Sequence, residues 1–157
     1  MTTPRIQTLI DKLEKGAQKT NEIFGKLTPE QWSQVIFPAP HTWTWQDLLA
    51  HFVSTEPRLL EIAQGVASGG EGTPEGYNFD AFNAEELARL RDYPFPRLMA
   101  MLDIARQETV DWVASLDDAH LDRVGRHPTL GIVSVEAMIT AIYGHQLLHM
   151  REAQGKK

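Results

Sequence analysis

The sequence of 157 residues contains no cysteine. Disulfides, thiolate metal ligands and a cysteine nucleophile are therefore excluded, and any thiol chemistry would need a thiol supplied by a co-substrate. Long hydrophobic runs are missing as well. Charged residues interrupt the N-terminal stretch MTTPRIQTLIDKLEKG, and no later segment approaches the roughly 18 apolar residues of a membrane span. We therefore expect a cytoplasmic protein with neither a signal peptide nor a membrane contact.

Positive charge is scarce, with 15 Lys and Arg against 21 Asp and Glu and a net charge of -6. No basic run and no alternation of basic and aromatic residues offers a path along a phosphate backbone, so nucleic acid is not an expected partner. The hydrophobic fraction of 42% and the charged fraction of 23% are ordinary for a globular protein. The length suits a single domain over residues 1–157.

Apolar residues recur at three- and four-residue intervals in four long segments, a spacing typical of amphipathic helices. These segments cover residues 3–26, 45–66, 96–116 and 135–153. Thr44 and Ser134 are suited to cap the second and fourth segments, and Pro57 predicts a kink or a break within the second. No strand longer than a few residues and no internal repeat is expected. The pattern predicts an all-α fold, a four-helix bundle.

The connections between these segments are expected to hold short extra helices. Thr28 followed by Pro29 predicts a helical turn, and Asn83 with Glu86 predicts the start of another short helix. The stretch SGGEGTPEG must be a loop, because its glycines and proline disfavour a helix. It is not a phosphate-binding loop, since no strand precedes it and no Lys-Ser or Lys-Thr pair follows.

Three histidines are expected to point into the bundle core from two helices. Steps of three and four residues place His145 and His149 on the apolar stripe of the last helix, and His51 on that of the second. Each of them, taken singly, is also consistent with a hydrogen-bonded core residue. Together they offer one ion three nitrogen ligands and leave a position open, and unpaired imidazoles in an apolar interior would be costly. The spacing leaves both interpretations standing.

Two other kinds of metal site are excluded by the neighbouring residues. A zincin needs Glu directly after the first His of its pair, but Gln146 follows His145. A di-iron bundle needs Glu three residues before its histidines, and none of the three has it. Asp47 and Glu152 are candidate partners of ligand imidazoles, with solvated helix-end carboxylates as the alternative.

The remaining histidines and the tryptophans receive simpler interpretations. We expect surface positions, with the lining of a pocket mouth as the alternative, for the three histidines that lie in turn or loop contexts: His41, His120 and His127. We expect packing roles for all four tryptophans: Trp32, Trp43, Trp45 and Trp112.

The stretches TWTWQDLLAHFVSTE and IYGHQLLHMREAQ together resemble the DinB superfamily, including its YfiT-like and mycothiol-dependent maleylpyruvate isomerase branches. The resemblance spans nearly the whole chain, with Trp45 in the lead-in to the second helix. It implies a four-helix bundle, often a homodimer, that holds one divalent ion, Zn, Ni or Fe, through His51, His145 and His149. The chain ends soon after the last helix, so we do not expect the C-terminal extension of the maleylpyruvate isomerases.

Three hypotheses for function follow from the residues and the resemblance. In the first, the protein is a transferase in which a metal activates a low-molecular-weight thiol, such as glutathione, mycothiol or bacillithiol, for attack on a small electrophile. In the second, the metal activates water for hydrolysis. In the third, the bundle is a non-catalytic stress-response or ligand-binding protein. A small-molecule substrate is the expected partner in the first two.

Overall fold

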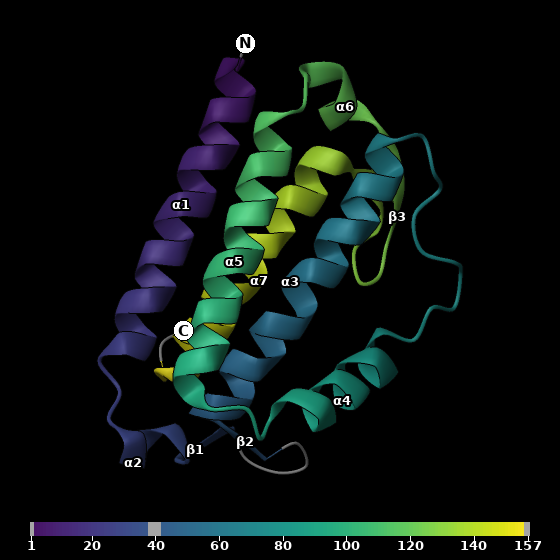
Figure 1. Ribbon diagram of the computed structural model, residues 1–157. Coiled ribbons are helices and arrows are strands. Elements are labelled where there is room, and N and C mark those ends of the chain that lie inside the picture. The colour runs from purple at the N-terminus through teal and green to yellow at the C-terminus, as the bar shows by residue number, and fades with distance from the viewer. Residues whose placement is uncertain (1, 38–41, 156–157) are drawn as a thin grey trace.

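The computed structural model describes residues 2–37 and 42–155, and four long helices lie side by side in it (Figure 1). They are α1 (Pro4–Gly25), α3 (Trp45–Ala67), α5 (Phe95–Ala114) and α7 (Val135–Ala153). Figure 1 shows α1 and α7 running in one direction, and α3 and α5 in the other. Both α5 and α7 pack against α1 and against α3. The predicted four-helix bundle is confirmed.

Three of the long helices, α1, α3 and α7, begin at a side-chain cap, because the capping oxygen pairs one of their first free backbone N–H groups. The Thr44 hydroxyl accepts a hydrogen bond from the Asp47 amide, and the Asp47 carboxylate accepts one from the Thr44 amide in return. Ser134 caps α7 by accepting from the Ala137 amide. Of the kink or break predicted at Pro57, the break is wrong, since α3 continues through this residue. Pro57 lies on the exposed face of α3, while the opposite face is held by its neighbours.

Short helices occupy the connections, as predicted: α2 (Pro29–Trp32), α4 (Phe79–Leu90) and α6 (Asp118–Asp122). The predicted start of α4 at Asn83 is wrong. The cap is Asn78, whose side-chain oxygen accepts from the Ala81 amide at 2.9 Å. Residues 68–76 form the expected loop between α3 and α4.

Two small antiparallel hairpins complete the fold. One pairs β1 (Val35–Phe37) with β2 (Trp43–Thr44), and the other pairs β3 (Val124–His127) with β4 (Gly131–Ser134). The second hairpin docks on the end of α3 through a glycine, because a Cβ at Gly125 would lie 2.5 Å from a methyl group of Val66. The hairpin is therefore held firmly beside the bundle.

The buried side chains form two apolar clusters, one toward each end of the bundle. The first contains Ile6, Leu13, Leu59, Val113 and Ile142 among others. The second contains Phe24, Leu48, Phe52, Leu98 and Met150 among others. Between them Glu56 and Arg106 form a buried ion pair, with 2.8 Å from the guanidinium Nε to a carboxylate oxygen. This polar layer spans the bundle from α3 to α5.

No helix in the described part of the chain combines the length and apolar character that a membrane crossing requires. The prediction that the chain lacks such a helix is confirmed for these residues.

Candidate metal centre

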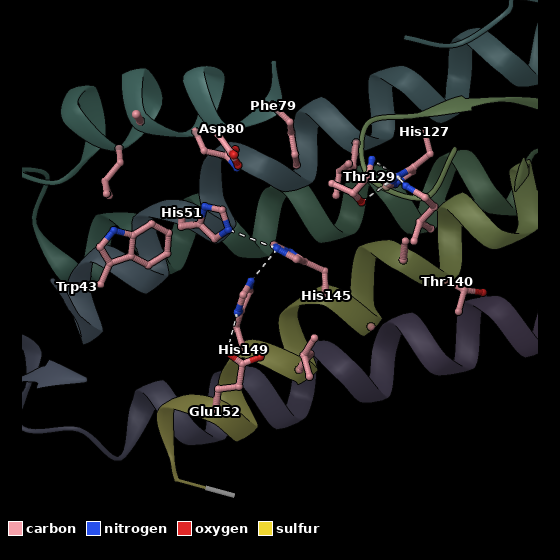
Figure 2. A pocket seen from close by; sticks show the side chains of 18 of the residues that line it. Trp43, His51, Phe79, Asp80, His127, Thr129, Thr140, His145, His149 and Glu152 are labelled. Atoms are coloured by element: carbon pink, nitrogen blue, oxygen red, sulfur yellow. Dashed lines mark hydrogen bonds and ion pairs between the residues drawn. The ribbon is translucent and has the colours of Figure 1, made fainter. Parts of the chain in front are cut away.

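The structure brings His51, His145 and His149 together. His51 lies in the second turn of α3, and the other two lie one turn apart on the facing side of α7 (Figure 2). The Nε2 atom of His145 is 3.4 Å from that of His51 and 3.0 Å from that of His149. The ligand nitrogens of the three residues all lie within 4.8 Å of one another.

These separations suit a single divalent ion. With nitrogen ligands at about 2.0–2.1 Å from a tetrahedral ion, the nitrogens are about 3.3 Å apart. The two Nε2 contacts of His145, at 3.4 and 3.0 Å, are close to that value. The three histidines can therefore hold one divalent ion through Nε2.

The hydrogen bonds of the triad support the same conclusion. The Nδ1 atoms of His51, His145 and His149 are buried and have no hydrogen-bond partner among the described residues. Their Nε2 atoms face one another, and a neutral imidazole has only one N–H to share between its two nitrogens. Lone pairs that face one another at these distances repel, whereas a cation would accept all three Nε2 lone pairs at once and leave the ring protons on Nδ1.

The electrostatics of the site favour neutral rings. The pKa of His51 is lowered to about 3. Burial is the largest cause, and the neighbouring His145 and His149 make smaller contributions. Burial also lowers the pKa of His145 to about 4, followed by smaller effects of His149 and His127. Near pH 7 both rings are therefore uncharged, and their lone pairs are available to a cation without prior loss of a proton.

Aromatic side chains surround the triad. The Trp43 ring lies 4.8 Å from the His51 ring between centroids, and the Phe52 ring lies 6.5 Å from that of His149. Trp43 lies in β2 of the hairpin β1–β2. The role predicted for it, packing, did not include this contact with the site. Trp45, by contrast, packs in the core against Phe24 at 6.0 Å, as predicted. The contact of Trp43 depends on how the hairpin folds back, which helical spacing does not report.

The two predicted partners of the ligand imidazoles have different outcomes. Asp47 is not one, because its carboxylate accepts from the Thr44 amide and pairs with Arg91 at 3.2 Å. The capping geometry turns this side chain toward the helix start. Glu152 lies near the triad, with a carboxylate oxygen 3.6 Å from His149 Nδ1. That distance is within ion-pair range and beyond a normal hydrogen bond.

The triad opens into a pocket of about 1490 Å³ between α4, α7 and the hairpin β3–β4 (Figure 2). All three histidines line it. The wall contributed by α7 includes three small residues, Ala137, Ala141 and Gly144, which leave room beside the helix. Among the described residues, the group of possible ligands comprises only the three histidines. One side of the triad therefore faces a space large enough for a substrate.

The remaining histidines differ in their outcomes. His120 is partly exposed, and its ring closes the capping box of α6 with Asp117. The predicted surface position of His127 is wrong, since only 5% of this residue is exposed. Backbone N–H groups of the following turn bind its ring and draw it inward. His41 lies outside the described residues.

Solved structures show the same fold at low sequence identity. YfiT from Bacillus subtilis, described as a probable metal-dependent hydrolase with an unusual four-helix bundle topology, matches with a TM-score of 0.79 at 16% identity, over 99% of this chain and 87% of that one. The mycothiol-dependent maleylpyruvate isomerase matches with a TM-score of 0.77 at 13% identity, over 98% of this chain and 63% of that one. This chain thus spans less than two thirds of the isomerase. At such identities the likeness shows the fold alone.

A third structure, the colibactin self-resistance protein ClbS in complex with a double-stranded DNA, matches with a TM-score of 0.69 at 16% identity, over 95% of this chain and 94% of that one. No protein of curated function matches the sequence. The model of the DinB superfamily matches residues 12–153, which include all three histidines of the triad. The chain belongs to the DinB superfamily.

Proposed function

We propose that this protein is a mononuclear metal enzyme that transfers a low-molecular-weight thiol to a small electrophile. The observation that carries the proposal is the triad itself, with three Nε2 atoms converging at the edge of a pocket of about 1490 Å³. A divalent ion bound there would lower the pKa of a thiol and so raise its thiolate fraction at neutral pH. Because the chain has no cysteine, the attacking sulfur must come from a second molecule.

The residues around the triad have definable roles in this proposal. His51, His145 and His149 would hold the ion as ligands, and the Trp43 ring packs against the ring of His51. Glu152 is the carboxylate best placed to orient His149. In the reaction, the thiol loses its proton to solvent, and its sulfur forms a bond to an electrophilic carbon as the leaving group departs with the bonding electron pair.

The size of the pocket favours two reactants over one. Ligand pockets usually measure about 300–1,000 Å³, and this one, at about 1490 Å³, exceeds that range. A thiol co-substrate and its acceptor together would use such a volume, whereas the co-substrate of a hydrolase is water. Hydrolysis is the second candidate, supported by the fold shared with YfiT, a probable metal-dependent hydrolase.

Metal binding is tested by elemental analysis after reconstitution with zinc, nickel or iron. We expect close to one ion per chain in the wild type and sharply lower occupancy in His51→Ala, His145→Ala and His149→Ala. His120→Ala is the matched control, because this partly exposed ring closes the cap of α6. Full occupancy in the double variant His145→Ala/His149→Ala would place the metal elsewhere.

Thiol activation is tested with a cobalt-substituted sample. Glutathione, mycothiol and bacillithiol are titrated separately, and the correct thiol should add a sulfur-to-cobalt charge-transfer band in the near ultraviolet. The same thiol should react faster with an electrophilic acceptor than it does with His145→Ala. If no thiol changes the spectrum while ester or amide substrates are hydrolysed, the second candidate is the correct one.

The assembly state is part of the same proposal. The DinB superfamily resemblance supports a homodimer with one small-molecule site in each chain. Sedimentation equilibrium across a range of protein concentrations would distinguish a dimer from a monomer.

A further inference from the structure

His127 is buried at the hairpin side of the pocket, and its protonation is fixed by the turn that follows it (Figure 2). The backbone N–H groups of Thr129 and Leu130 both donate to its Nδ1, at 3.1 and 3.2 Å. An atom that accepts two such hydrogen bonds must carry a lone pair rather than a proton. In the neutral ring the proton therefore sits on Nε2.

This Nε2–H group has no assigned task within the fold. It is buried and has no hydrogen-bond partner among the described residues. The turn uses only Nδ1, so a structural role for His127 leaves the second nitrogen unexplained. An unpaired buried donor costs free energy, and His127 is one of the residues that line the pocket, so a ligand bound there is the candidate partner for this donor. Burial also lowers the pKa of His127, so the donor is a neutral ring rather than a cation.

The charges around the pocket indicate what kind of acceptor fits. The charged residues among its described lining, other than histidines, are Asp80, Arg91, Glu136 and Glu152. Arg91 already pairs with the buried carboxylate of Asp47 at 3.2 Å. The described lining thus offers an anion no unpaired Lys or Arg, and the acidic groups would repel it. A neutral acceptor meets no such penalty.

We propose that His127 is a positioning residue that donates its Nε2–H to an uncharged oxygen acceptor, such as an amide or ketone carbonyl, on the molecule that occupies this pocket. The inference depends on the proposed function only in assigning the pocket to the substrate. It adds that the substrate reaches from the triad toward the hairpin and carries an uncharged carbonyl group there. The mostly apolar helix faces between these ends suit an aliphatic body.

Two substitutions test the roles of the two ring nitrogens of His127 separately. In His127→Asn the side-chain oxygen takes the place of Nδ1 and preserves the turn, but the Nε2–H donor is lost. In His127→Gln the side-chain amide reaches the place of Nε2 and preserves a donor, but the acceptor for the turn is lost. The pair therefore distinguishes ligand binding from turn stability.

The experiment uses metal-free protein, so its outcome does not depend on the triad. Hexanamide is the neutral probe, and hexanoate is the anionic probe of the same length. Binding is followed by NMR of protein labelled with ¹⁵N-histidine. In the wild type we expect the His127 Nε2 to carry the proton and its resonance to shift as hexanamide is added.

We expect hexanamide to bind His127→Asn about five-fold more weakly than the wild type, the loss typical of one hydrogen bond. His127→Gln should bind within about two-fold of the wild type while melting at a lower temperature. Hexanoate should bind more weakly than hexanamide. Equal hexanamide binding by His127→Asn, tighter binding of hexanoate, or an unmoved His127 resonance at the solubility limit of hexanamide would each overturn the inference. Failure of metal or thiol binding would instead overturn the proposed function and leave this result intact.

Discussion

Around Glu56 the polar side chains are fully paired, whereas around His51, only five positions earlier on the same helix, they are not. One Glu56 oxygen accepts from Arg106 and Gln146, and the other accepts from Arg106 and Thr109, all at 2.7–2.9 Å. In the triad the Nδ1 atoms have no hydrogen-bond partners among the described residues, and the Nε2 atoms face one another.

The difference separates a structural cluster from a binding site. A buried network in which each member is paired joins helices and has no capacity left for a ligand. A buried cluster with unused lone pairs is poorly satisfied on its own and gains most when a ligand arrives. Gln146 and His145 illustrate this as neighbours on α7, since one side chain turns to Glu56 and the other to the pocket.

Breaking the paired cluster should have the largest effect on stability. In Arg106→Met the Glu56 carboxylate would stay buried without its partner, so we expect the free energy of unfolding to fall by about 3–5 kcal/mol. Urea denaturation followed by circular dichroism measures the change. The double variant Glu56→Leu/Arg106→Met is the control and should recover most of the loss, because it removes both charges. A double variant as unstable as the single one would contradict this account.

Binding of a metal ion to the triad should have the next largest effect on stability. Free zinc at 100 times its dissociation constant should raise the free energy of unfolding of the wild type by about 2.7 kcal/mol. His145→Ala/His149→Ala should show no such gain. Without metal, the two proteins should unfold within about 1 kcal/mol of each other, because the triad makes few favourable hydrogen bonds. A large loss in the metal-free variant would show that the triad is a structural cluster too.

Low pH should lower the stability of the metal-free protein through the histidines of the triad. The pKa values of His51 and His145 are lowered to about 3 and about 4. The unfolded chain takes up protons near pH 6.5 and the folded protein only at lower pH, so stability is complete above pH 6.5 and falls below it. Each of these histidines should contribute a slope of about 1.4 kcal/mol per pH unit between pH 6 and pH 5.

The matched variant for this test is His51→Ala/His145→Ala. Its metal-free form should lose less stability over the same pH interval, as measured by urea denaturation. His127, whose pKa is also lowered by burial, should account for part of the slope that remains. Parallel pH profiles for the variant and the wild type would show that the triad is not the source of the acid sensitivity.

The smallest expected effect on stability comes from Thr44, which caps the helix that contributes to both clusters. Thr44→Ala removes the cap of α3, the helix that carries Glu56 and His51, and should cost about 1 kcal/mol. Zinc affinity measured by calorimetry should stay unchanged, because the folded site keeps its ligands. Thr44→Ser is the control and should retain nearly full stability. A change in zinc affinity in Thr44→Ala would mean that the cap also positions His51.

Much of the fold could be predicted because helices are governed by local rules. The caps at Thr44 and Ser134 follow from short-range hydrogen bonding, and the inward stripe that carries His51 follows from helical period. The start of α4 was misplaced because Asn78 and Asn83 are both acceptable caps by sequence. A break at Pro57 was wrongly predicted, because α3 remains packed against its neighbours and continues through this residue.

The amino-acid sequence alone determined the four amphipathic helices, the absence of a cysteine nucleophile and the inward placement of three histidines. These properties depend on residue type and on spacing within single helices. The tertiary structure decided which atoms meet: the Nε2 atoms of the triad, the Trp43 ring against His51, and the buried Nε2 of His127. Those contacts join residues distant in the chain, so they depend on the angles at which helices pack and hairpins dock, which no local pattern specifies.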